Sequence, residues 1–157
     1  MKRSSLFCLI ACLLMLSLSA SSKPTKKTKK QAVTVYDLRV ENMTSPLGLN
    51  VTMPRFSWKL QSDQQQVSQT AYRILVASSL EELSENRGTL WDSGDVPSSR
   101  QLWIPYIGSS LKSNQRAYWK VCVTTNVGQS DWSKPQMFGI GLLNESKWSG
   151  QWIGLEG

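Results

Sequence analysis

The sequence contains no histidine among its 157 residues, and this absence narrows the chemistry open to the chain. Histidine is the usual base of serine nucleophiles and a frequent zinc ligand. Cysteine is scarce as well, since two of the three cysteines, Cys8 and Cys12, lie in an apolar N-terminal run. No glycine-rich phosphate loop is present either. The sequence therefore predicts no metal site and no cofactor.

The part of the chain expected to fold has no excess of positive or negative charge. The formal charge of the chain is +7, but residues 1–20 carry two basic side chains and residues 23–30 carry five lysines. Residues 31–157 hold 11 basic and 11 acidic side chains, so their net charge is zero. A nucleic-acid partner requires a basic face on a fold, and we therefore expect none. We interpret residues 21–32 as a flexible Lys-rich leader, which could also touch anionic lipid or other polyanions.

The chain also lacks an apolar run long enough to span a membrane. The apolar segment Leu6–Leu18 has about 13 residues, whereas a spanning helix needs roughly 20. Lys2 and Arg3 precede it and small residues follow it, which is typical of a secretory signal peptide. We predict that residues 1–20 are removed and that the protein is exported to the periplasm, cell surface or medium of a bacterium. The remaining chain has no predicted membrane span and only Cys122, so an intrachain disulfide is excluded.

After Val33 the sequence does contain short segments in which apolar and polar residues alternate. In the clearest of them Phe56, Trp58 and Leu60 share one face, which is the pattern of a half-buried strand. Seven such strands are predicted, at about residues 35–41, 55–60, 70–78, 90–93, 101–105, 117–124 and 136–140. The third is apolar on both faces at its end and is expected to be central. The pattern predicts an all-β antiparallel sandwich over residues 33–143.

One short helical segment is predicted between these strands, and the acidic residues near it are candidates for chemistry. We expect one or two helical turns at Leu80–Asn86, closed by Gly88. A glycosidase needs two carboxyl groups across a cleft, one of them with a raised pKa. The acidic residues fit a solvated helical face and a turn better than a cleft: Glu81, Glu82, Glu85, Asp92 and Asp95. We predict no catalytic residue, and we interpret Cys122, in the middle of a strand, as a small buried hydrophobe.

Seven tryptophans are the unusual feature of the composition. Trp58 and Trp119 lie at inward-facing strand positions and are predicted to be core anchors. Others could stack on a sugar ring, or pack at sandwich edges or against a neighbouring domain. As candidates for sugar or interdomain contact we single out four residues: Trp91, Trp103, Trp148 and Trp152.

A series of motifs resembles a known family over residues 35–154. The segments that carry it are Leu38–Asn42, Pro46–Leu49, Pro54–Trp58, Gln69–Tyr72, Leu75–Ser79, Leu90–Gly94, Gly141–Leu143, Trp148 and Trp152–Gly154. Together they resemble the N-terminal immunoglobulin/fibronectin type III-like domain of bacterial α-L-rhamnosidases of glycoside hydrolase family 78. A separate stretch, from Tyr118 to Phe138, resembles the end of a fibronectin type III-like domain, which is a likeness of fold alone.

The resemblance implies a non-catalytic accessory domain. Such enzymes remove terminal α-L-rhamnose with inversion, using an acidic pair in a C-terminal (α/α)6 barrel, and no position of this sequence matches that pair. The resemblance also implies that residues 144–157, with Trp148 and Trp152, begin a linker to a downstream domain. We therefore expect a truncated rhamnosidase chain, inactive alone, whose partners are the downstream domains and rhamnose-containing glycans. A free-standing carbohydrate-binding module or a protein-interaction sandwich is the alternative.

Overall fold

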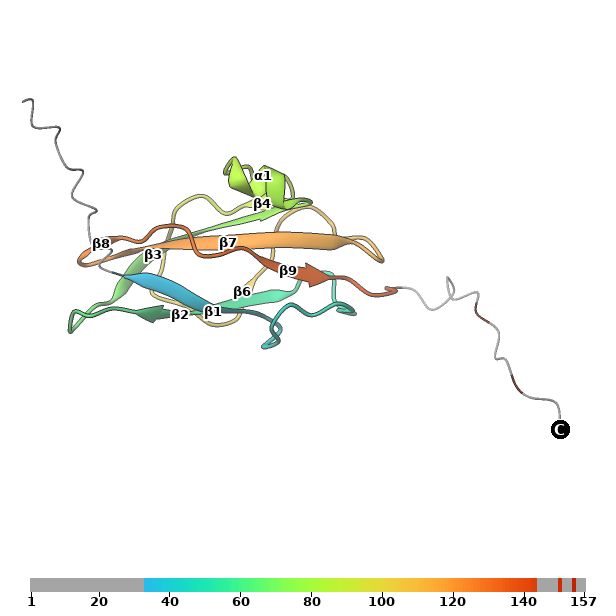
Figure 1. The fold of residues 1–157 in the computed structure, drawn as a ribbon, viewed down its shortest axis with the longest axis horizontal. Coiled ribbons are helices and arrows are strands. Elements are labelled where there is room, and N and C mark those ends of the chain that lie inside the picture. The colour runs from blue at the N-terminus through green and yellow to red at the C-terminus, as the bar shows by residue number, and fades with distance from the viewer. Residues whose placement is uncertain (1–32, 144–149, 151–153, 155–157) are drawn as a thin grey trace, which may run out of the picture.

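The structure, a computed structural model, describes residues 33–143 together with Gly150 and Gly154. The predicted signal peptide (1–20) and leader (21–32) lie outside the described residues, as does the predicted linker (144–157) apart from those two glycines. The described chain forms two sheets of antiparallel strands that pack face to face, with one short helix on the outside (Figure 1). The predicted all-β sandwich is confirmed.

The smaller sheet has three strands in the order β1-β2-β6. They are β1 (Thr34–Val40), β2 (Arg55–Gln61) and β6 (Ile104–Pro105). The register between β1 and β2 shifts between Tyr36 and Arg39, and Asp37 has a φ of 50° there. This bulge resets the alternation of β1, so that Val35 and Leu38 both point into the core although they are three residues apart.

The larger sheet is built around two long strands, β3 (Gln69–Ala77) and β7 (Arg116–Thr125). β4 (Trp91–Asp92) and β5 (Val96–Pro97) pair with β3, while β8 (Gly128–Gln129) and β9 (Gln136–Gly139) pair with β7. β3 is therefore central, as predicted. The two-residue strands β5 (Val96–Pro97) and β8 (Gly128–Gln129) add to the seven predicted strands.

The helix α1 spans Leu80–Ser84 and lies on the outer face of the larger sheet (Figure 1). Ser79 caps it, accepting a hydrogen bond from the backbone N–H of Glu82 at 3.2 Å. The prediction that Gly88 closes the helix is wrong, because Asn86 takes the left-handed conformation instead, with a φ of 58°. Glycine is required at position 88 for a steric reason, because a Cβ atom there would lie 2.4 Å from the carbonyl oxygen of Trp91.

The core between the sheets is aromatic, with Phe56 at its centre. Its ring centroid lies 4.4 Å from that of Trp119 and 5.7 Å from that of Phe138. Trp58 makes an edge-to-face contact with Tyr72, with ring centroids 5.3 Å apart. Trp58 and Trp119 are both buried, so the prediction that they anchor the core is confirmed.

Candidate functional site

The loop that follows β5 is held in place by a buried amide, and this loop carries the most exposed tryptophan among the described residues. The side chain of Gln69 donates to the carbonyl oxygens of Ser98 and Arg100 at 2.9 and 2.8 Å. Its oxygen accepts the indole N–H of Trp58 at 3.0 Å. The backbone N–H of Trp58 in turn donates to the carbonyl of Gln101 at 3.0 Å. These bonds fix the loop against β2 just before Trp103.

Trp103 occupies an unusual place for so large an apolar side chain. It is 41% exposed, and its φ of 57° lies in the left-handed region that disfavours residues with a Cβ atom. Its backbone N–H donates to the Ser57 hydroxyl at 3.2 Å, and its carbonyl accepts from the Arg100 guanidinium at 3.2 Å. The guanidinium of Arg55 lies 4.3 Å from the ring centroid, within range of a cation–π interaction.

Arg55 is itself held by a fork of bonds to Glu41. Its Nη2 lies 2.7 Å from Oε2 of Glu41, and its backbone N–H donates to Oε1 at 2.7 Å. The side-chain hydrogen bonds from Arg55 hold the pKa of Glu41 below its ordinary value, and the same bonds raise the pKa of Arg55. The cation that lies over Trp103 is therefore fixed in position and permanently charged.

A second ion-pair group lies beside the first on the outer face of the smaller sheet. Asp37, at the bulge in β1, accepts bonds from Lys59 at 2.8 Å and from Arg39 at 2.9 Å. Hydrogen bonds from Lys59 and then Arg39 lower the pKa of Asp37. Two adjoining hollows, which share Trp58, Lys59 and Leu102, run across this surface. We call this surface the Trp103 face and define it by eight residues: Asp37, Arg39, Glu41, Arg55, Lys59, Arg100, Leu102 and Trp103.

The structure separates the four tryptophans that the sequence grouped as contact candidates. Trp91 is half-buried, and its ring stacks on Phe56 with centroids 6.1 Å apart and meets Tyr106 edge-on at 5.5 Å. Trp103 is exposed on the face just described. Trp148 and Trp152 lie outside the described residues. Of the two tryptophans of this set that the structure describes, Trp103 is therefore the one whose surroundings suit contact with a ligand.

Two of the acidic residues considered as candidates for chemistry, Asp92 and Glu82, are engaged in hydrogen bonds. Asp92 binds Arg73 through two hydrogen bonds, of 3.0 and 2.7 Å, and accepts the backbone N–H of Gly94 at 2.9 Å. Those bonds lower the pKa of Asp92, and bonds from Ser78 and Thr89 lower that of Glu82. A catalytic acid requires the opposite shift.

The described residues also bear on a nucleophilic cysteine, a metal site and a membrane-spanning helix. Cys122 is buried and unpaired, and burial raises the pKa of its thiol, so it is held as the unreactive thiol. No group of three or more cysteine, aspartate or glutamate side chains in residues 33–143 could hold a metal ion. In the same part of the chain, no helix is long and apolar enough to cross a membrane.

Sequence reasoning missed the charged partners of Trp103. Arg55 and Lys59 alternate with the apolar residues of β2 and are exposed, but alternation does not say which tryptophan lies beside them. Arg100 was missed altogether. Its place three residues before Trp103 was the available signal, and the turn between them is what brings the two residues together.

The protein-family model described as Rha78A-like, N-terminal immunoglobulin domain, matches residues 35–144. An α-L-rhamnosidase of Formosa agariphila is 43% identical over 114 residues, which are 71% of this chain and 12% of that protein. One of Streptomyces avermitilis is 40% identical over 123 residues, or 78% of this chain and 12% of that protein. The chain thus spans about an eighth of the length of these relatives.

Two solved structures share the fold. The crystal structure of the Streptomyces avermitilis α-L-rhamnosidase complexed with L-rhamnose matches 78% of this chain and 12% of its own, with a TM-score of 0.73 and 40% identity. The α-L-rhamnosidase structure from Dictyoglumus thermophilum has a TM-score of 0.73 at 39% identity and covers 78% of this chain and 14% of its own. In both proteins the matched region is one part of a much larger chain.

Proposed function

From the premise that this chain belongs to the Rha78A-like N-terminal immunoglobulin domain family, we propose that it is the non-catalytic accessory domain of an exported α-L-rhamnosidase. One observation carries the proposal: the family match covers nearly the whole described sandwich, while relatives named α-L-rhamnosidase extend far beyond it. In this role the sandwich supports the catalytic region and helps to present rhamnose-containing glycans to it.

The parent reaction is the hydrolysis of terminal α-L-rhamnose with inversion. In an inverting glycosidase a carboxylic acid protonates the leaving oxygen, and a carboxylate activates water on the opposite face of the sugar. We assign both groups to domains other than this one, because the described carboxyl groups whose pKa is shifted are all held ionised by hydrogen bonds: Asp37, Glu41, Glu82 and Asp92.

Export remains part of the proposal and rests on the sequence alone. The basic residues Lys2 and Arg3, the apolar run and the small residues after it support removal of residues 1–20. The mature protein would then reside in the periplasm, at the cell surface or in the medium. N-terminal sequencing of the protein recovered from these fractions would locate it and identify the cleavage site.

A hydrolysis assay of the purified chain tests the non-catalytic role. We expect no release of nitrophenol from p-nitrophenyl α-L-rhamnoside, with a full-length relative such as the Streptomyces avermitilis enzyme as the positive control. Turnover by the chain alone would contradict the proposal.

A free-standing binding module is the second candidate, and the exposed Trp103 favours it. The same surface could serve either an accessory domain or an independent module, so binding alone does not choose between them. Pairing with a protein through the edge strand β1 is the remaining alternative. Self-association measured by analytical ultracentrifugation would support that reading.

A further inference from the structure

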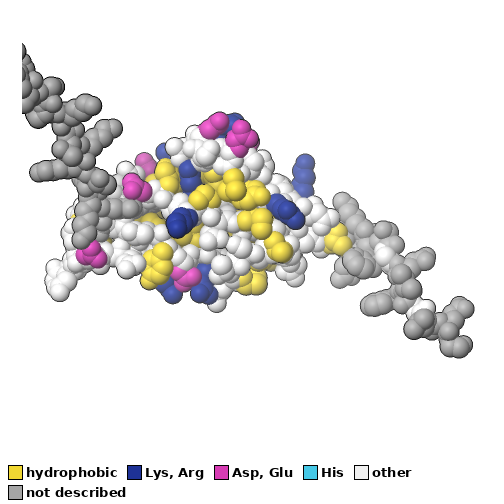
Figure 2. Space-filling model, viewed as in Figure 1, with side chains coloured by type: hydrophobic (Ala, Val, Ile, Leu, Met, Phe, Trp, Pro, Cys, Tyr) yellow, Lys and Arg dark blue, Asp and Glu magenta, His cyan; other side chains and the backbone are white. Residues whose placement is uncertain are grey.

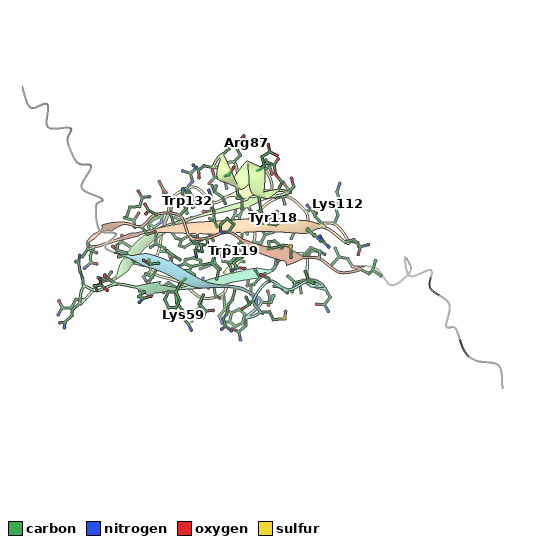
Figure 3. All side chains as sticks on the ribbon, viewed as in Figure 1. Lys59, Arg87, Lys112, Tyr118, Trp119 and Trp132 are labelled. Atoms are coloured by element: carbon green, nitrogen blue, oxygen red, sulfur yellow. The ribbon has the colours of Figure 1, made fainter. Side chains whose placement is uncertain are left out.

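We propose that the Trp103 face binds an acidic saccharide, a chain of sugars that bear carboxylate or sulfate groups. The inference rests on the proposed function only in taking the ligand to be a saccharide. Three features carry it: the presentation of Trp103, the surplus of positive charge around it and the hydrogen-bond donors beside it. These features lie on the side of the sandwich opposite α1, where Figure 3 labels Lys59, with Arg87 on the far side.

Trp103 is held exposed at a conformational cost. A left-handed backbone disfavours any residue with a Cβ atom, and glycine would relieve that strain. The ring does not belong to the hydrophobic core cluster, so packing does not account for its presence. Arg55, itself held by Glu41, lies over the ring and fixes its orientation. The guanidinium covers part of the ring, and the C–H face of a pyranose can stack on the part of the indole that stays exposed.

The charge on this face favours an anionic partner. The face carries four cationic side chains and two carboxylates: Arg39, Arg55, Lys59 and Arg100 against Asp37 and Glu41. Glu41 matches Arg55, and Asp37 is shared between Arg39 and Lys59, which leaves one positive charge in excess there. Within residues 33–143 the Arg100 guanidinium donates to the carbonyl of Trp103 and pairs with no carboxylate, so none of these acidic residues neutralises its charge. At the lower margin of Figure 2 basic, acidic and apolar side chains are mixed over β1 and β2.

The donors beside the ring suit the acceptor oxygens of a sugar acid. Lys59, Arg100 and Gln101 line the same hollow as Trp103, and the amide and the two cations offer N–H groups at its wall. A guanidinium binds a carboxylate or sulfate through paired hydrogen bonds, which hydroxyl groups do not match. The combination of a stacking surface and neighbouring cations therefore selects an acidic sugar over a neutral one.

Calorimetric titration of the purified chain with an oligogalacturonide tests the proposal. We expect saturable binding that weakens as salt is added, and about tenfold weaker binding of the carboxyl-reduced oligosaccharide. Trp103→Gly and Arg100→Gln should each weaken binding about tenfold. Because glycine relieves the left-handed strain, the melting temperature of Trp103→Gly should stay near that of the parent chain. Arg87→Gln, on the opposite side of the sandwich, should bind as the parent does.

Several results would overturn the proposal. These are the absence of saturable binding, equal binding of the acidic and reduced sugars, or parent-like binding by both face variants. An equal loss in Arg87→Gln and Arg100→Gln would also overturn it, since attraction would then follow total charge. The lysines of residues 23–30 are present in every variant, so their attraction to a polyanion cancels in the comparison. The probe contains no rhamnose, so a failure to bind it leaves the rhamnosidase assignment intact. Failure of the rhamnosidase assignment would likewise leave binding of this probe intact.

Discussion

Gln69 is a single buried residue that joins the core to the candidate site. It is 4% exposed; its amide nitrogen donates to the carbonyls of Ser98 and Arg100, and its oxygen accepts from Trp58. A buried amide stabilises the fold only when its hydrogen-bond partners are present. Removing the amide leaves each of those partners without a hydrogen bond. The position of the loop that presents Trp103 therefore depends on this side chain.

Replacing Gln69 by leucine should lower the free energy of unfolding by about 2 kcal/mol, because it leaves an indole N–H and two carbonyl groups unpaired. Urea denaturation followed by tryptophan fluorescence measures this. Gln65→Leu, at an exposed position, is the matched control and should change the free energy little. Equal effects of the two substitutions would show that the amide network contributes nothing.

Tyr106 makes the stability of the folded domain depend on pH in the alkaline range. Its hydroxyl lies 2.6 Å from the carbonyl oxygen of Ser109, and burial raises its pKa to about 12 from an ordinary 10. The pKa in the folded state is thus higher than in the unfolded state. The resulting stabilisation is fully present below pH 10 and is lost as pH rises through 12.

The loss should amount to roughly 2 kcal/mol between these two pH values, at about 1.4 kcal/mol for each pKa unit. Unfolding free energies of the parent and Tyr106→Phe, measured across that range, isolate this contribution from the other titrating groups. The parent should lose more stability than the variant. Parallel curves for the two proteins would show that Tyr106 does not set the dependence.

At the scale of elements, the short helix α1 is attached to the sheet by a buried cation. Lys120, in the middle of β7, is 6% exposed, and its ammonium group donates to the carbonyl of Leu83 and, at 2.6 Å, to the side chain of Asn86. The ring of Trp132 lies 4.9 Å from the same nitrogen. Desolvation lowers the pKa of Lys120, and the bonds to the end of α1 offset part of that cost.

Lys120→Met should detach the helix more than it unfolds the sandwich. We expect a loss of about 1–3 kcal/mol in the free energy of unfolding, because two acceptors lose their donor. Amide hydrogen exchange should quicken in α1 and remain slow in β3 and β7. Lys112→Met, at an exposed position, is the control and should leave exchange in α1 unchanged. Uniform exchange in Lys120→Met and the parent would contradict this role.

The elements also show where sequence patterns stop being informative. Alternation predicted β2, β3 and β7 well, since side chains of a long strand repeat every second residue, even where β3 and β7 are buried on both faces. It did not predict the bulge at Asp37, because the left-handed residue there follows from pairing with β2 rather than from local preference. Gly88 was assigned to the helix end, whereas its small size is required by the nearby Trp91 backbone, a contact between segments.

For the whole molecule, the sequence predicted the sandwich and the family, but only part of the candidate site. Composition showed an unusual number of tryptophans, and position in the alternating strand pattern separated Trp58 and Trp119 from the others. Position in the alternating pattern did not separate Trp91, which packs on Phe56, from Trp103, which does not. The difference arises from the loop that Gln69 holds and from charges on β1 and β2, which come together only in the folded chain.

The central claim is that this sandwich is the accessory domain of a larger α-L-rhamnosidase. The most direct measurement is an immunoblot of the source cells with an antibody against residues 33–143, together with a rhamnosidase assay of the bands separated under native conditions. We predict a band several times larger than the 17.6 kDa of this chain, with rhamnosidase activity in the same band. A single band at or below 17.6 kDa, without activity, would contradict the claim.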